Sequence, residues 1–152
     1  MRPLPCAAFV LSLLLSPAAA QAETWWKLGS TTENKGLYID ADSVSVDDEG
    51  YAAYRGMFVY SSTWTTDDGQ QIRYEVFDAE IDCLMGELYE KSRVFYGDNR
   101  GFIARDDSGE FVDIESGKAS AWEADFVCDS PDAWSGYGYY RVADPVADTR
   151  GW

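Results

Sequence analysis

Residues 77–83 read FDAEIDC, and their strict alternation of apolar and acidic side chains decides the fold class. The apolar members fall on one face of an extended chain: Phe77, Ala79, Ile81 and Cys83. The three acidic side chains fall on the opposite face, because successive side chains of a strand point to opposite sides. A period of two is typical of a strand with one face on a core. We therefore predict a strand over residues 71–83, with Cys83 on its core side.

Acidic turns that contain Gly or Ser punctuate the chain on either side of this strand. They lie at residues 47–50, 67–69 and 106–109. Asp bonds its own backbone in turns and Gly accepts a positive φ, so each turn predicts a hairpin. Between the turns lie aromatic and β-branched segments, which we expect to be strands at residues 25–28, 36–39, 51–61, 71–83, 87–96, 101–105 and 110–114, with a local turn at 40–43. This arrangement predicts an antiparallel sheet.

A helical period appears once, near the end of the fold. Ala119, Trp122 and Phe126 recur at spacings of three and four, which is one face of a short helix. Ser116 or Ser120 is expected to cap its start. The predicted class is therefore α+β: a mainly antiparallel β-sheet with one short C-terminal helix and a single disulfide.

Two segments outside the predicted domain have a different composition. Residues 1–22 have the features of a signal peptide, and residues 23–129 carry the predicted domain. In residues 130–152 Gly, Pro and Asp discourage regular structure, although the tyrosines are able to add one edge strand. We expect this tail to be partly disordered from about Pro145 onward.

The signal peptide is expected to be cleaved rather than retained as an anchor. Arg2 precedes an apolar run at residues 7–15, and small residues follow, up to an A-x-A pattern that ends at Ala22. The run of about nine apolar residues is too short for a membrane core that needs about 20. We predict cleavage after Ala22, with Ala20 as the alternative, and no transmembrane segment in the mature form. Cys6 precedes the apolar run, so a lipid anchor is not expected.

The charge of the chain limits its partners. It has 12 Lys and Arg against 27 Asp and Glu, a net charge of −15; without Arg2 the balance is 11 against 27, or −16. Such a charge repels nucleic-acid phosphates and anionic lipid surfaces, so neither is an expected partner. It agrees with a solvated acidic surface or with cationic partners.

Two cysteines, Cys83 and Cys128, remain once the signal peptide is removed. In an exported chain they most simply pair with each other. A redox motif would need C-x-x-C spacing, and a zinc site would need further His or Cys ligands in a chain that has no His. We predict a structural disulfide that pins the helix to the strand of residues 71–83.

The motifs of catalysis are missing from the sequence. Without His there is no Ser-His or Cys-His arrangement, and no G-x-S-x-G, P-loop or dinucleotide-binding motif occurs. The run at residues 40–44 begins like a calcium loop but has Val44 where Asp or Asn is expected. A glycosidase needs two carboxylates about 5–10 Å apart in a cleft, which a small domain seldom offers. We expect no enzyme, no metal and no cofactor.

Two groups of side chains are candidates for binding. Three tryptophans are candidates for a sugar-stacking or protein-binding patch, the alternative being core and rim positions: Trp25, Trp26 and Trp64. Four arginines are expected to pair with surface carboxylates, the alternative being a ligand clamp: Arg73, Arg93, Arg100 and Arg105.

Several short motifs occur in the order found in a known family. They are WWKL at 25–28, YID at 38–40, SV at 43–44, the aromatic stretch 51–60, EIDC at 80–83 and VC at 127–128. Over residues 24–129 the chain resembles the surface-adhesin protein E-like family of Gram-negative bacteria. The resemblance implies a small exported domain with an antiparallel sheet, a helix and one disulfide, in which Cys83 and Cys128 take the paired positions.

The function expected from these observations is non-enzymatic. We expect an exported, periplasmic or secreted binding domain with a protein or another ligand as its partner. The alternative is a surface-displayed adhesin that binds host extracellular proteins, which is what the resemblance implies for the named adhesin of the family.

Overall fold

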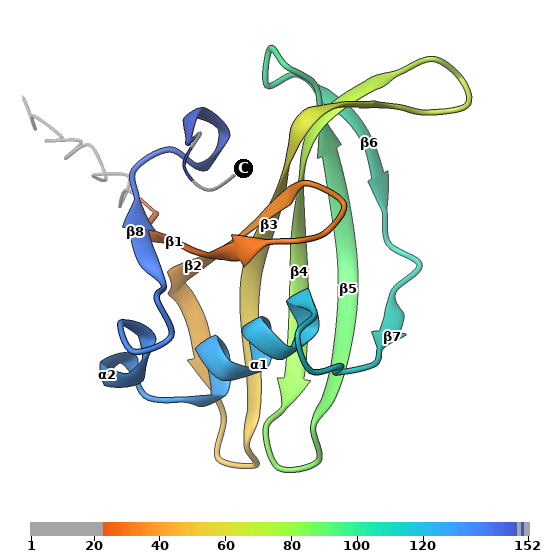
Figure 1. Cartoon of the computed structure of the whole chain (residues 1–152). Coiled ribbons are helices and arrows are strands. Elements are labelled where there is room, and N and C mark those ends of the chain that lie inside the picture. Colours follow the sequence, from red (N-terminus) through yellow and green to blue (C-terminus); the bar gives the residue numbers. More distant parts are fainter. Residues whose placement is uncertain (1–22, 149, 151–152) are drawn as a thin grey trace, which may run out of the picture.

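One antiparallel sheet dominates the computed structural model, which describes residues 23–148 and 150 (Figure 1). The predicted signal peptide, with Cys6 and the cleavage point at Ala22, lies outside the described residues. The strands are β1 (Trp25–Ser30), β2 (Lys35–Val46), β3 (Tyr51–Thr65), β4 (Gln71–Asp82), β5 (Glu87–Tyr96), β6 (Phe102–Asp106), β7 (Glu110–Val112) and β8 (Tyr140–Val142). Their order is β6-β5-β4-β3-β2-β1-β8, and β7 also pairs with β5.

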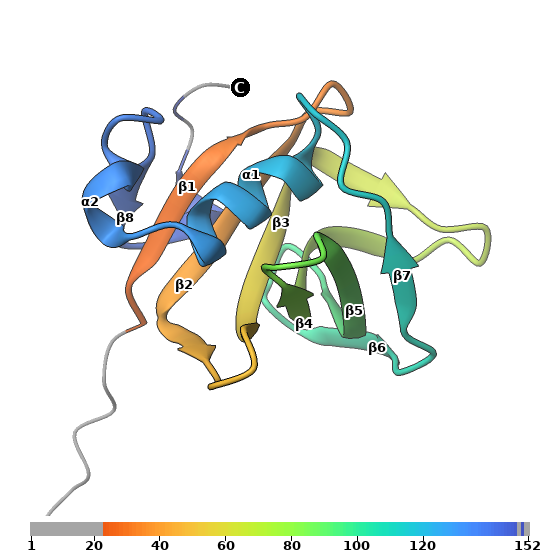
Figure 2. The same ribbon diagram turned by 90° about the horizontal axis from the view of Figure 1, so that it is seen from below.

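The sheet is curved, and helix α1 (Ala119–Cys128) lies across its concave face (Figure 2). The helix packs against β1, β2 and β3. It approaches β1 closely at Gly29, where an added Cβ would lie 2.9 Å from the ring of Trp122. Because α1 covers the β1–β3 side, the β4–β5 side of the concave face lies beyond the helix. This asymmetry positions the candidate site.

The main core lies between α1 and the concave face, as the alternation in β4 predicts. Phe77, Ala79 and Ile81 are 1, 2 and 1% exposed and belong to this core, and Cys83 packs against it. Phe126 of α1 is fully buried and stacks on Trp134, with ring centroids 3.9 Å apart. The predicted face of the helix is thus the one that faces the sheet.

A second, smaller core lies on the convex face of the sheet, opposite α1. Its buried members are Trp25, Tyr38, Met57, Val59, Tyr74 and Val142. Beyond β8 the chain forms a 3-10 turn, η1 (Pro145–Ala147), and Val146 packs against this second core. The C-terminal segment therefore covers part of the convex face, opposite the face on which α1 lies.

A buried ion pair fixes that segment to the first strand. Nζ of Lys27 lies 3.4 Å from Oδ2 of Asp148, and both side chains are 3% exposed. Tyr38 donates a hydrogen bond to the same carboxylate at 3.2 Å, and Nζ of Lys27 also donates to the backbone oxygen of Arg150. Burial alone would raise the pKa of Asp148, but the hydrogen bonds from Arg150 and the charge of Lys27 hold it below its usual value.

The tail contains regular structure that its composition does not predict. Residues 131–134 form a short helix, α2 (Pro131–Trp134), and η1 begins at Pro145. The partial disorder expected from about Pro145 onward stays a prediction, since residues 149, 151 and 152 lie outside the described residues. The expected edge strand of tyrosines is β8, which pairs with β1. The difference has a physical reason: Trp134 and Tyr139 are buried against the main core, so apolar burial orders a segment whose composition discourages regular structure.

The predicted hairpin turns at 47–50 and 67–69 are present, whereas the one at 106–109 is wrong. Gly50 and Gly69 have φ values of 93° and 82°, which Gly accepts without strain. The third turn separates β6 from β7, and both of these strands pair with β5 rather than with each other. The ten residues of β5 are enough to pair with both short strands, so β6 and β7 follow each other along β5. Between them the Ser108 amide donates a hydrogen bond to the Asp106 side chain.

Two further local expectations are corrected. The turn expected at 40–43 is a bulge inside β2, with a register shift between Asp40 and Ser45 and a hydrogen bond from Ser43 to the Asp40 carbonyl. Neither expected serine caps α1, whose N-cap residue is Lys118 and has no side-chain cap bond. Ser120 instead joins the preceding loop, because its hydroxyl donates to the Asp113 carbonyl and accepts from the Glu115 amide.

The predicted disulfide between Cys83 and Cys128 is present, with Cα atoms 5.6 Å apart and a sequence separation of 45. It joins the end of β4 to the end of α1. We expect the double variant Cys83→Ala/Cys128→Ala to lose about 4 kcal/mol of unfolding free energy, because the bond restricts a loop of this length in the unfolded chain. Urea denaturation measures the loss. Wild-type protein treated with reductant should unfold at the same midpoint as the variant, and an unchanged midpoint in both would contradict the stabilising role.

Candidate functional site

The part of the concave face that lies beyond α1 is hollowed. Two adjoining hollows of about 700 and 530 Å³ share four lining residues: Glu33, Lys35, Glu75 and Arg93. We call the two together the front cavity. It lies between the β1–β2 turn, the start of α1 and the strands β3, β4 and β5. A small domain seldom offers such a cleft, and this one does.

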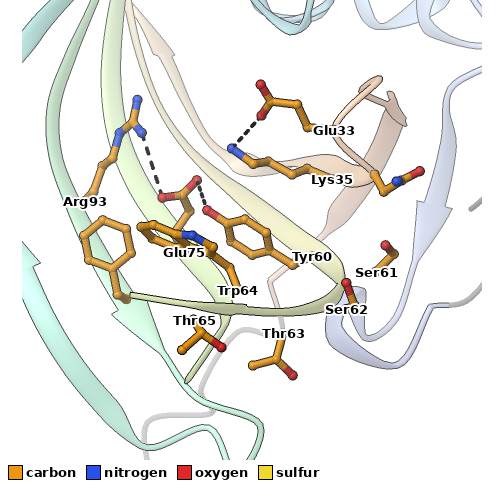
Figure 3. Close-up of a pocket in the computed structure, with 12 residues that line it drawn as sticks. Glu33, Lys35, Tyr60, Ser61, Ser62, Thr63, Trp64, Thr65, Glu75 and Arg93 are labelled. Carbon is orange, nitrogen blue, oxygen red and sulfur yellow. Dashed lines mark hydrogen bonds and ion pairs between the residues drawn. The ribbon is translucent and has the colours of Figure 1, made fainter. Parts of the chain in front are cut away.

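The floor of the front cavity carries two buried carboxylates joined by one arginine. Glu75 and Glu90 are 2 and 5% exposed. The Arg93 guanidinium lies 3.9 Å from Glu75 and donates a 2.7 Å hydrogen bond to Glu90. Tyr60 donates a further hydrogen bond to Glu75 at 3.3 Å (Figure 3). Burial raises the pKa of both carboxyl groups, and the charge of Arg93 opposes that rise.

The register of β5 explains how this trio meets. Glu90 pairs with Ala79 and Arg93 pairs with Phe77, although a regular strand would point residues three apart to opposite faces. A bulge between these two pairs adds one residue to β5, so that Arg93 and Glu90 lie on the same face. Both side chains therefore lie on the face of Ala79 and Phe77, which is the face of the main core.

A third buried carboxyl group lines the cavity from α1. Glu123 is 2% exposed, and its Oε2 accepts a 2.6 Å hydrogen bond from the Tyr54 hydroxyl. Burial raises the pKa of Glu123 to about 8, the Tyr54 bond opposes the rise and the charge of Glu90 adds to it. Glu123 is therefore mostly protonated at neutral pH.

Lys35 places an ammonium group over the aromatic wall of the cavity. Its Nζ lies 5.1 Å from the Tyr60 ring centre and 5.9 Å from that of Phe58, and 3.1 Å from a Glu33 oxygen. Trp64 stacks nearly parallel on Tyr60, with ring centroids 6.2 Å apart and an interplanar angle of 21°. Figure 3 shows the Lys35–Glu33 pair beside the Tyr60–Glu75–Arg93 group. The cavity thus combines carboxylates with flat aromatic surface.

The three candidate tryptophans do not form one patch. Trp25 is 5% exposed and belongs to the core on the convex face, whereas Trp26 packs with Phe126 and Trp134 beside the main core. Neighbouring residues of a strand point to opposite faces, which separates them. Trp64 is 48% exposed and lines the front cavity. Two of the tryptophans thus have core positions and Trp64 lies at the rim of the cavity, which is the alternative of core and rim positions.

All four candidate arginines pair with carboxylates, as expected. The partners are Asp98 for Arg73, Asp144 for Arg100, Asp107 for Arg105, and Glu75, Glu90 and Glu110 for Arg93. The expectation that the carboxylates lie on the surface fails for Arg93, since Glu75 and Glu90 are buried. Arg93 is the member of this group that belongs to the site.

The sequence contains signals for two site residues that were missed. Glu75 is in phase with Phe77, Ala79 and Ile81, so extending that alternation backwards places a carboxylate on the core face. Glu123 lies four residues after Ala119 and three before Phe126, which places it on the buried face of the helix. An acidic residue in phase with an apolar stripe is thus the useful signal.

Among residues 23–148 and 150, no three or more His, Cys, Asp and Glu side chains are grouped so as to hold a metal ion. None of the helices in this part of the chain has the length and the apolar character required to cross a membrane.

Fold and site together define a small, disulfide-linked, single-sheet domain with one covering helix and an acidic cavity. No family model and no curated protein matches the chain. Among solved structures it is similar to Haemophilus influenzae protein E, with 14% identity over 82% of this chain and 93% of that one and a TM-score of 0.49. A second crystal form shares 15% identity over 67% and 82%, again with a TM-score of 0.49.

Proposed function

We propose that this chain is an exported, non-enzymatic binding domain whose ligand occupies the front cavity. One observation carries the proposal: three buried carboxyl groups and a half-buried arginine line an open cavity of about 700 Å³. Burying charged groups destabilises a fold more often than it helps, so such groups are characteristic of functional sites. A concave site with convergent polar groups on an aromatic background is typical of ligand binding.

Binding is favoured over catalysis by the way in which the carboxyl groups are engaged. Glu75 and Glu90 share Arg93, and Glu123 is bonded to Tyr54. Hydrolysis by a carboxylate pair needs both groups to face the scissile bond, one as acid and one as base or nucleophile. The chain also has no His to serve as a general base.

Export is supported by two independent features. The first 22 residues have the pattern of a signal peptide. The Cys83–Cys128 disulfide forms and persists in oxidising compartments such as the periplasm or the extracellular space. A periplasmic location accommodates both.

A screen by thermal shift tests the binding function. We expect members of a library of small polar metabolites to raise the melting temperature of the wild-type mature protein, and this rise to be lost in Glu75→Gln. This variant keeps the shape of a buried floor residue but removes its charge. Glu87→Gln, in which the carboxylate is exposed at the start of β5, is the matched control and should respond as wild type does. Ligands that act equally on all three proteins would contradict binding in the front cavity.

A surface-displayed adhesin is the second candidate, and one observation favours it. Leu84 and Met85 are 81 and 73% exposed in the turn between β4 and β5, and Val46 is 59% exposed near the adjacent turn. The Cys83 amide donates to the Gly50 carbonyl, so the two turns lie side by side. Exposed apolar side chains of this kind are characteristic of protein contacts. Digestion of the protein by protease on intact cells would favour this candidate, whereas protection until the outer membrane is permeabilised would favour the periplasm.

A further inference from the structure

We propose that the front cavity selects ligands that carry a primary ammonium or guanidinium group, which binds between the buried carboxyl groups and the Tyr60–Trp64 wall. The inference rests on the proposed binding function and specifies the chemistry of its ligand. Three observations carry it: the charge of the lining, the environment of Lys35 and the burial of Glu123 in the cavity wall.

The lining has an excess of acidic groups. In the larger hollow six Asp and Glu side chains line the wall against three Lys and Arg side chains. Protonation of Glu123 at neutral pH removes one of the six and leaves the balance negative. The whole chain carries a net charge of −15, so its long-range field draws cations toward the site and repels anions.

The cavity already accommodates one ammonium group of the protein itself. Lys35 lies over Tyr60 and Phe58 at distances at which a cation is attracted to an aromatic face, and Glu33 pairs with it from the solvent side. Trp64 extends the aromatic surface beyond Tyr60 and is 48% exposed. The wall is thus suited to a second cation placed next to Lys35.

Glu123 places a third buried carboxyl group in the wall of the larger hollow. Its Oε2 accepts the hydrogen bond of the Tyr54 hydroxyl. A ligand ammonium group beside Glu123 would favour the charged carboxylate, which burial disfavours. Binding of such a cation would therefore release the proton of Glu123 to solvent.

A matched set of five-carbon probes tests the inference by calorimetry on the mature protein. The probes are 1,5-diaminopentane, 1,5-pentanediol and glutarate, which differ only in their end groups. We expect the diamine to bind at least about tenfold more tightly than the diol, because hydrogen bonds between charged groups are the stronger ones, and glutarate not to bind. The peptides acetyl-Gly-Lys-Gly-amide and acetyl-Gly-norleucine-Gly-amide distinguish the sources: tighter binding of the Lys peptide than of the diamine assigns the cation to a protein partner.

Two variants give opposite expected changes. Glu75→Gln should weaken binding of the diamine by about tenfold, because one charged acceptor is lost. Lys35→Met should strengthen it, since the competing ammonium is removed, and a gain of affinity cannot arise from misfolding. Weaker binding in Lys35→Met would overturn the inference.

The outcomes separate the inference from the function on which it rests. Binding of the diol or glutarate as tight as that of the diamine, abolished by Trp64→Ala, would overturn the ligand class and leave a binding cavity in place. Failure of every probe and of every compound in the metabolite screen would overturn the proposed function together with the inference.

Discussion

Lys27→Met is expected to lower the free energy of unfolding by about 1.5–3 kcal/mol, because the buried Asp148 carboxylate loses one of its two cationic partners and keeps Arg150. Both side chains are 3% exposed, so water does not replace the lost partner. The variant should also release the C-terminal segment, because Nζ of Lys27 donates a hydrogen bond to the backbone oxygen of Arg150. Urea denaturation measures the first effect, and faster proteolysis within residues 143–152 measures the second.

The control for this prediction is an exposed ion pair of the same sheet. Lys91 lies 2.9 Å from Glu80, with side chains 45 and 36% exposed. Lys91→Met should cost less than about 1 kcal/mol, because water and salt screen such a pair. An equal loss of unfolding free energy in the two variants would show that burial does not strengthen the pair between Lys27 and Asp148.

The stability of the domain should fall by roughly 4–5 kcal/mol between about pH 4.5 and pH 8 through the titration of Glu123 alone. The pKa of this group is raised from 4.5 to about 8 in the folded protein. Between these values the folded state keeps a proton that the unfolded state has released. The stabilisation is therefore complete below pH 4.5 and is lost as the pH rises through 8.

Glu123→Gln isolates this contribution from those of other carboxyl groups. Glu75 and Glu90 also have raised pKa values, so they change stability in the same direction. We expect the free energy of unfolding of Glu123→Gln to rise relative to that of wild type as the pH increases. Urea denaturation at one-unit intervals from pH 5 to pH 9 measures this difference. A difference that is independent of pH would refute the assignment to Glu123.

The sequence predicts the sheet better than it predicts the site, and two kinds of pairing explain why. The alternation in residues 77–83 is local, so β4 and its core face follow from it directly. The placement of Arg93 depends on a bulge that exists only because β5 pairs with β4. No property of residues 87–96 alone identifies that register, so the Glu75–Arg93–Glu90 group is not predictable from them.

The errors in the predicted elements have the same origin. An Asp-rich segment with Gly predicts a hairpin from local chemistry, yet at residues 106–109 the long partner strand β5 decides that the chain continues along one edge. In the tail, composition predicts little structure, whereas burial of Trp134 against Phe126 gives it a helix. In each case a tertiary contact outweighs local preference.

The pairing of β1 with β8, together with the contact between Lys27 and Asp148, has a consequence for biogenesis. The first strand, β1, pairs with β8 only after more than a hundred further residues have been synthesised. Until then one edge of the sheet is open and the smaller core is incomplete. Contacts so distant in sequence form late, because a long loop must close first. Under the export proposed above, the sheet and the smaller core would therefore be completed only after the last segment of the chain has crossed the membrane.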